Sequence, residues 1–181
     1  MRERIKAILY RIRGEYTTEQ LQKRGLVVGK NFKRLHGVIL DESHCWLITI
    51  GDNVTFAPNV HVLAHDASTK YHLGYTKIGS VKIGNNVFVG AESVILPGVE
   101  IGDNVIIGAN SVVTRSLDSD NVYGGNPAVK ICSLTEYLDK QTKLMNETAV
   151  FDESYTIADG ITDEKKKEMI NKLKNGRGFV V

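Results

Sequence analysis

His65 is the side chain in this sequence best suited to acid–base chemistry, and Asp66 follows it directly. An imidazole has an unperturbed pKa of about 6.5, so near neutral pH it can take a proton from a weakly acidic group and pass it on. Such a base works best when a second group orients its ring. The candidates for that group are Asp66, the acidic pair Asp41–Glu42 and a backbone carbonyl. The sequence therefore predicts an acid–base site at His65.

The residues around His65 repeat every six positions. Nine hexads open with an apolar residue, at Ile50, Phe56, Val62, Ile83, Val89, Ile95, Ile101, Ile107 and Val113. Six of them have Gly or Ala second, and Asn is frequent in the fourth place. A period of six fits neither a helix nor a strand alone, but it fits a short strand followed by a corner. Gly lets the backbone turn there, and Asn tolerates left-handed angles.

Three such hexads predict one triangular coil, in which each opening residue points inward and stacks on its counterpart 18 residues later. His65 takes the fourth place of its hexad, so we expect it at a corner, pointing out of the stack. The segment near 68–82 does not fit the repeat and is expected to leave it as a loop just after His65. Long loops within compact repeats tend to be functional. Without this loop, His65 would be interpreted as an ordinary polar corner residue.

Composition narrows the class of protein. The 181 residues carry a formal net charge of +2, which does not indicate a nucleic-acid partner. The two cysteines, Cys45 and Cys132, form neither a disulfide framework nor a zinc signature. The first apolar residues are interrupted by Lys6 and Arg11, and no stretch approaches the ~20 apolar residues of a membrane span. We therefore expect a cytoplasmic protein without a membrane span.

Three segments are expected: an N-terminal helical segment (1–25), the repeat domain (26–131) and a C-terminal helical tail (132–181). A helix over 2–13 is apolar on one side and basic on the other, which favours packing on the repeat or on a partner subunit; a membrane-surface helix is the alternative. Ser133 and Glu136 form a capping box that predicts a helix to about Asn146. A linker over 148–160 and a helix over 163–174 follow.

The chain resembles the hexapeptide-repeat acyltransferases, especially the maltose, galactoside and capsular polysaccharide O-acetyltransferases. The resemblance covers residues 26–131 and rests on the hexads, on GGNPA at 124–128, and on Phe56–Val60 (FAPNV) shortly before His65. It implies a mainly β fold, a left-handed parallel β-helix with N- and C-terminal α-helices. The handedness comes from the resemblance alone, because parallel crossovers are normally right-handed.

The resemblance implies acetyl transfer from acetyl-coenzyme A to a hydroxyl of a sugar or glycan, with His65 as the catalytic base. His65 would take the hydroxyl proton as the oxygen attacks the thioester and return it to the departing thiolate. We expect direct transfer without an acyl-enzyme, because neither cysteine lies near His65 in the repeat register. In these relatives an Asp of the preceding coil contacts the acceptor, which Asp41 or Glu42 could match. Asn59 and Asp66 are further candidates for binding or orienting the acceptor.

The family binds coenzyme A in a groove between adjacent subunits of a trimer, so the resemblance also implies a homotrimer. The backbone N–H of Ala91 matches the group that stabilises the oxyanion. Ala109 and Thr114 match positions along the pantetheine arm of coenzyme A. Arg115 and Lys130 match positions near its nucleotide phosphates. Two departures are Phe88, which stands where Trp is frequent, and Lys130, which comes one place later than the usual basic residue.

Other functions remain open from the sequence. The acceptor could be a sugar amine or a hydroxylated antibiotic. Zinc-dependent carbonic anhydrases share the fold, but the spacing of His61, His65 and His72 departs from their ligand pattern. We therefore expect the protein to use acetyl-coenzyme A as its co-substrate and to require no metal. A scaffold without activity is the third possibility. His36 and His44 are expected near the acceptor cleft.

Overall fold

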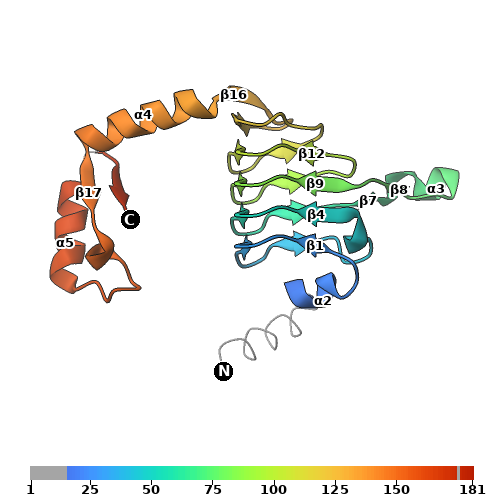
Figure 1. Ribbon diagram of the computed structural model, residues 1–181, viewed down its shortest axis with the longest axis horizontal. Coiled ribbons are helices and arrows are strands. Elements are labelled where there is room, and N and C mark those ends of the chain that lie inside the picture. Colours follow the sequence, from blue (N-terminus) through green and yellow to red (C-terminus); the bar gives the residue numbers. More distant parts are fainter. Residues whose placement is uncertain (1–15, 175) are drawn as a thin grey trace. The chain divides into compact units, whose positions relative to one another are not determined.

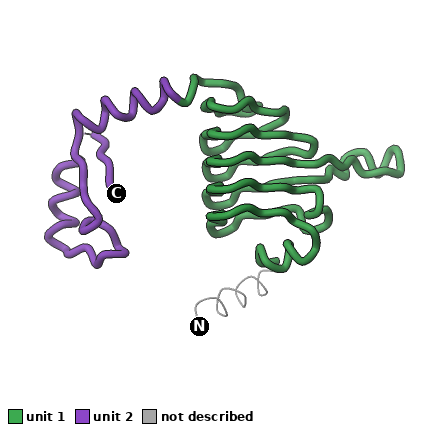
Figure 2. The backbone as a smooth tube through the Cα atoms, in the orientation of Figure 1, with its two compact units in different colours: residues 1–134 green, residues 135–181 purple. Residues whose placement is uncertain are grey.

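The computed structural model describes residues 16–174 and 176–181. The predicted helix over residues 2–13 lies outside this part of the chain. Two compact units are distinguished, one ending at Leu134 and the other running from Thr135 to Val181 (Figure 2). No helix among the described residues is both long and apolar enough to cross a bilayer.

Short parallel strands from successive hexads build three sheets in the first unit (Figure 1). The chain enters the three sheets in turn, so each of the first four coils adds one strand to every sheet. The first sheet holds β1 (Val27–Val28), β4 (Ile48–Ile50), β9 (Val81–Ile83) and β12 (Glu100–Ile101). The second holds β2 (Lys33–Arg34), β5 (Thr55–Phe56), β10 (Phe88–Val89), β13 (Ile106–Ile107), β15 (Asn121–Gly124) and the antiparallel β16 (Val129–Ser133). The third holds β3 (Ile39–Leu40), β6 (His61–Val62), β11 (Val94–Ile95) and β14 (Val112–Val113).

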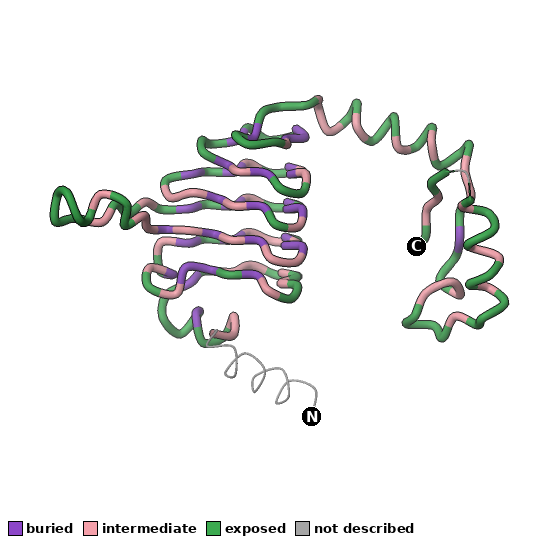
Figure 3. The backbone as a smooth tube through the Cα atoms, turned by 180° about the vertical axis from the view of Figure 1, so that it is seen from behind, coloured by how far each residue is buried: buried purple, intermediate pink, exposed green. Residues whose placement is uncertain are grey.

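The core is the column of apolar side chains that open the hexads. All nine predicted openers are buried, and in the third sheet Val62, Ile95 and Val113 stand in register on successive strands with no exposed surface. Figure 3 shows buried segments, in purple, recurring from one coil to the next. Burying one such side chain contributes about 1.5–3 kcal/mol. The inward stack predicted from the six-residue period is therefore confirmed.

Asparagines form one corner of the coils, where the chain passes from the first sheet to the second. Asn31, Asn53, Asn86 and Asn104 all have φ between 55° and 57°, the left-handed region that Asn tolerates. Their side-chain amides hydrogen bond in series, from Asn31 to Asn53 (2.9 Å), to Asn86 (3.1 Å), to Asn104 (2.9 Å) and finally to Asp120 (2.9 Å). We call this series the asparagine ladder; it ties each coil to the next.

The predicted loop after His65 is a hairpin arm that leaves the stack (Figure 1). β7 (His65–Asp66) pairs antiparallel with β8 (Lys77–Ile78), and a 3-10 helix (Ala67–Thr69) and α3 (Lys70–Leu73) lie between them. Asp66 forms a 2.6 Å ion pair with Lys77 across this pairing. The N–H of Gly79 donates to the carbonyl of Ala64 at 3.0 Å, which closes the base of the arm. The arm therefore begins at His65 itself.

The first coil is longer than a regular one, because Val28 and Ile50, which pair on β1 and β4, are 22 residues apart, whereas Ile83 and Ile101 on β9 and β12 are 18 apart. A 3-10 helix, Cys45–Leu47, follows β3 and precedes β4. Below this coil, α2 (Thr18–Gln22) begins with a capping box between Thr17 and Gln20. Leu21 of α2 is fully buried against the core, so this helix covers the end of the apolar column.

The second unit contains all but the first residue of α4 (Leu134–Glu147), followed by β17 (Ala149–Phe151), a 3-10 helix (Glu153–Tyr155), α5 (Asp163–Lys172) and β18 (Gly178–Val180). Two helices were predicted here, but the prediction of a plain linker over 148–160 is wrong. β17 pairs in parallel with β18, and this pairing of distant segments leaves no local period in the sequence. Phe151 of β17 is buried at 3% exposure.

Candidate active site

His65 lies at the corner where the chain passes from the third sheet to the first. It comes three residues after Val62 of β6 and is the first residue of the arm. Its side chain is 36% exposed, whereas the preceding Ala64 is fully buried. The imidazole is therefore at the outer surface and not among the stacked aliphatic side chains, as its place in the hexad predicted.

Asp41 of the preceding coil lies directly behind the imidazole. It follows β3, its N–H donates to the carbonyl of Val62 at 2.9 Å, and its side chain is 1% exposed. Its Oδ2 is 2.5 Å from Nδ1 of His65 and accepts the Ala64 N–H at 2.9 Å. Strand pairing between successive coils therefore holds the carboxylate against the ring.

The other oxygen of Asp41 is held by the irregular segment of the first coil. Oδ1 accepts the Ser43 N–H (3.1 Å), the Ser43 hydroxyl (2.8 Å) and the His44 N–H (3.1 Å). Burial alone would raise the pKa of Asp41, but the hydrogen bonds from His65, Ser43 and Ala64 outweigh it and hold this pKa below its usual value. An ionised carboxylate only accepts hydrogen bonds, so the proton lies on Nδ1 of His65 and the lone pair on Nε2.

The other candidates for orienting His65 have different partners. Asp66 pairs with Lys77 and accepts the Ser68 N–H, and the pKa of Asp66 is lowered mainly by Lys77. Glu42 accepts the N–H of Tyr16 at 3.3 Å. Asn59, at the corner between the second and third sheets, donates to Glu92 at 2.6 Å. The structure thus brings Asp41 to the imidazole of His65 and directs the side chains of Asp66, Glu42 and Asn59 to other groups.

Three aromatic rings form a row beside the site. The ring of His44 lies 5.2 Å from that of His65 and 5.3 Å from that of Trp46, measured between centroids. Trp46 is 55% exposed. Sequence reasoning had placed His44 near an acceptor cleft but missed Ser43 and Trp46. The only indication of these two residues in the sequence was the extra length of the first coil. A repeat pattern does not predict the conformation of residues that lie outside the repeat.

Of the six residues predicted to bind coenzyme A, four lie at two corners of the stack and two lie on strands of the second sheet. Ala91 and Ala109 lie at the corner between the second and third sheets, where the carbonyl of Ala91 accepts the Asn110 N–H at 2.9 Å. Thr114 and Arg115 follow β14 and lie on the same edge of the stack as His65, because Val113 continues the register of Val62. Phe88 on β10 and Lys130 on β16 are both exposed.

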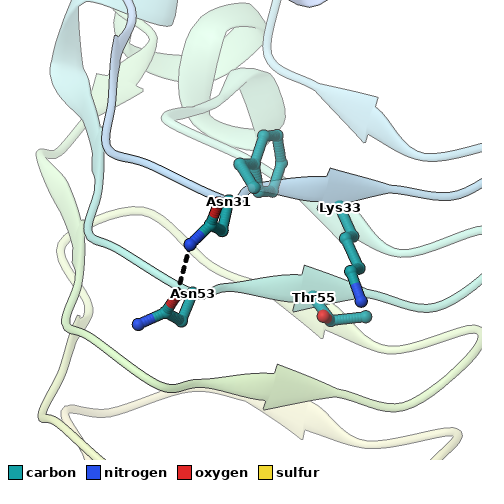
Figure 4. A pocket seen from close by; sticks show the side chains of 5 residues that line it. Asn31, Lys33, Asn53 and Thr55 are labelled. Carbon is teal, nitrogen blue, oxygen red and sulfur yellow. Dashed lines mark hydrogen bonds between the residues drawn. The ribbon is translucent and has the colours of Figure 1, made fainter.

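A separate hollow of about 460 Å³ lies on the first two coils (Figure 4). It is lined by Asn31, Phe32, Lys33, Asn53 and Thr55, which belong to the asparagine corner and to the second sheet. None of the predicted site residues lines it. The Asp41–His65 pair, on another corner, is therefore the better candidate for chemistry.

Comparisons with known proteins agree with this architecture. Residues 80–115 match the family described as bacterial transferase hexapeptide (six repeats). Protein CapG of Staphylococcus aureus is 37% identical over 180 residues, which cover 95% of this chain and 98% of CapG. Galactoside O-acetyltransferase of Escherichia coli (strain K12) is 39% identical over 104 residues, which cover 55% of this chain and 50% of that enzyme.

Solved structures show the same fold. A hexapeptide-repeat acetyltransferase of Vibrio cholerae, complexed with acetyl-coenzyme A, aligns with a TM-score of 0.55 and 28% identity over 61% of each chain. A maltose O-acetyltransferase of Clostridium difficile 630 aligns with a TM-score of 0.50 and 31% identity over 64% of this chain and 73% of that one. This chain thus spans nearly all of CapG but only part of the other relatives.

Proposed function

The chain belongs to the bacterial hexapeptide-repeat transferases and is an acyltransferase, and from this premise we propose that it moves an acetyl group from acetyl-coenzyme A to a hydroxyl of a sugar or glycan. We also propose that its three sheets wind as a left-handed parallel β-helix. The single observation that carries the chemistry is the contact between the buried Asp41 carboxylate and Nδ1 of His65.

His65 acts as the general base in this proposal. With its proton on Nδ1, held by Asp41, the imidazole presents the lone pair of Nε2 to the acceptor. Nε2 takes the hydroxyl proton while the oxygen attacks the thioester carbonyl carbon. The carbon–sulfur bond then breaks, and Nε2 returns the proton to the departing thiolate. A positioned general base of this kind typically contributes about 10²–10⁴-fold in rate.

Direct transfer fits the position of the nearer thiol. Cys45 lies next to His44 in the sequence, but it is fully buried and its Sγ donates to the carbonyl of Leu21 at 3.6 Å. Its sulfur therefore faces α2 and not the His65 surface. A mechanism in which the acceptor oxygen attacks the thioester itself requires no enzyme nucleophile.

A sugar acceptor is supported by the aromatic row and by the names of two relatives. Exposed rings such as Trp46 offer a flat apolar face on which the C–H face of a sugar can stack, while the polar groups of His44 and Ser43 lie beside it. The two O-acetyltransferases named above act on galactosides and on maltose. We propose Asp41 as the group that orients His65, with Glu42, Asn59 and Asp66 outside the chemical step.

We further propose a homotrimer with the donor bound between subunits. Within one chain, Ala91 and Ala109 lie on a different corner from His65, so a second copy is needed to bring an Ala91 corner to a His65 corner. The outward row of the third sheet, with Ile39, Val94 and Val112 in register beside His61, offers an apolar strip for that contact. In this arrangement the Ala91 N–H stabilises the oxyanion, and coenzyme A contacts Phe88, Ala109, Thr114, Arg115 and Lys130.

The test is acetyl transfer to a panel of sugars by the full-length chain, followed by release of the coenzyme A thiol and by mass spectrometry of the products. The variants His65→Ala and His65→Asn are compared with His72→Ala, which removes an exposed imidazole from the arm. We expect both His65 variants to lose transfer and His72→Ala to keep it. Undiminished transfer by His65→Ala would show that another group is the base.

A further inference from the structure

Three side chains at the site have the chemistry of a metal-binding group. One ligand atom from each of Asp41, His44 and His65 can be chosen so that all three lie within 4.8 Å of one another. Asp41 is buried and fixed by its hydrogen bonds, whereas the two imidazoles are partly exposed. The proposed transfer uses Asp41 and His65 but gives no reason for a second imidazole at this distance.

The three side chains converge on a single atom, the hydroxyl oxygen of Ser43. This oxygen is 2.8 Å from Oδ1 of Asp41, 2.9 Å from Nδ1 of His44 and 3.3 Å from Nδ1 of His65. Ser43 is itself exposed, so its side chain can rotate into solvent and vacate this point. Its position marks a place that one carboxylate oxygen and two imidazole nitrogens can reach together.

These donors suit zinc better than the common hard cations. Zinc binds imidazole nitrogen at about 2.0–2.1 Å and carboxylate oxygen at about 2.0–2.2 Å, and three protein ligands plus water complete its usual open coordination. With Asp41 held in place, the two imidazoles would have to move in by about 1 Å, which the partly exposed His44 and His65 side chains allow. Magnesium and calcium prefer all-oxygen sites and are not expected to compete.

We propose that Asp41, His44 and His65 form a Zn²⁺ site and that its occupation inhibits acetyl transfer. The inhibition, though not the binding, rests on the proposed function. A zinc ion on Nδ1 of His65 leaves the ring proton on Nε2, because a neutral imidazole carries one proton and the metal takes the other nitrogen. His65 then has no lone pair to receive the acceptor proton.

Binding is tested by calorimetric titration of the full-length, metal-free chain with zinc sulfate, repeated with magnesium sulfate. We expect one Zn²⁺ per chain, and a loss of affinity of about 10–100-fold or more in His44→Ala and in His65→Ala. His36→Ala and His72→Ala are the matched controls and are expected to bind as the unmodified chain does. His44→Gln keeps a polar side chain without an imidazole, and it replaces His44→Ala if the smaller residue impairs folding.

The result that would overturn the site is the absence of stoichiometric zinc binding, or His44 variants that fold and bind zinc as tightly as the unmodified chain. Inhibition is measured separately, as acetyl transfer with increasing zinc and its recovery on adding a chelator. Full transfer with the site occupied would overturn the inhibitory role. If zinc binds as described while no acetyl transfer is found with any acceptor, the metal site stands and the proposed function fails.

Discussion

Replacing Asp41 with Asn tests how the site sets the protonation of His65. Asn has the same size, but one carboxylate oxygen becomes an NH₂ group that donates. Oδ1 accepts from three donors and Oδ2 from two, His65 Nδ1 and the Ala64 N–H, so the NH₂ group is less unfavourable at the Oδ2 position. There it faces Nδ1 of His65, which must then accept a hydrogen bond, and the ring proton moves to Nε2.

The expected loss follows from this change of tautomer. A ring with its proton on Nε2 cannot serve as the base, so kcat should fall by up to the general-base contribution of about 10²–10⁴-fold. At 1.36 kcal/mol for each factor of ten, this is about 2.7–5.4 kcal/mol of transition-state stabilisation. The buried N–H of Ala64 also loses its acceptor, which costs about 1–3 kcal/mol of folding stability.

The assay is the initial rate of coenzyme A thiol release over a range of acceptor concentrations, with kcat and KM determined separately. Folding of Asp41→Asn is checked by its thermal transition, since some loss of stability is expected. Glu42→Gln is the matched control, because it removes the neighbouring carboxylate, whose partner is Tyr16 and not His65. If Asp41→Asn folds and keeps kcat within about tenfold, the carboxylate does not set the tautomer and the reasoning fails.

Three further predictions concern stability. The pKa of Asp41 is lower in the folded chain than its unfolded value of about 3.9. The Asp41 carboxylate therefore stabilises the folded chain above about pH 4, and this stabilisation is lost as the pH falls through the folded pKa. In urea titrations, the difference in unfolding free energy between the unmodified chain and Asp41→Asn should shrink from pH 6 to pH 3. Asn53→Ala should cost about 1–2 kcal/mol for its left-handed backbone in addition to its ladder bonds, and Asn53→Gly less; equal losses would contradict this. Gly90→Ala should lower the melting temperature by calorimetry, since a Cβ there would lie 2.4 Å from the backbone nitrogen of Ala109; an unchanged transition would show that the coils can move apart.

The stack of short strands could be predicted from the sequence because its period is local. Each hexad shows its inward residue and its corner residue within six positions, so burial at Ile95 and the left-handed angle at Asn104 follow from residue type alone. The departure of the arm after His65 was likewise visible, since the repeat there is interrupted. The pairing of β17 with β18 could not be predicted, because α5 separates these two short strands in the sequence and their pairing leaves no periodic pattern.

The partner of His65 could be narrowed to a few carboxylates but not chosen. The extra residues of the first coil made the register of Asp41 and Glu42 uncertain by more than one position, and a shift of one residue turns a side chain to the opposite face. The choice depends on the conformation of residues 41–44, in which the N–H groups of Ser43 and His44 donate to Asp41. Trp46 was missed for the same reason, since its place beside His44 depends on the conformation of that turn.

The asparagine ladder has a direction and an end. Asn53, Asn86 and Asn104 each accept from one neighbouring coil and donate to the next, and Asn31 begins the series as a donor, whereas the Asp120 carboxylate only accepts. An additional 18-residue unit inserted between Asn86 and Asn104 could both accept and donate a ladder hydrogen bond. The same unit added after Asp120 would receive no hydrogen bond from the Asp120 side chain. The ladder therefore ends at Asp120, and lengthening it there would first require a side chain that can donate, such as asparagine, at that position.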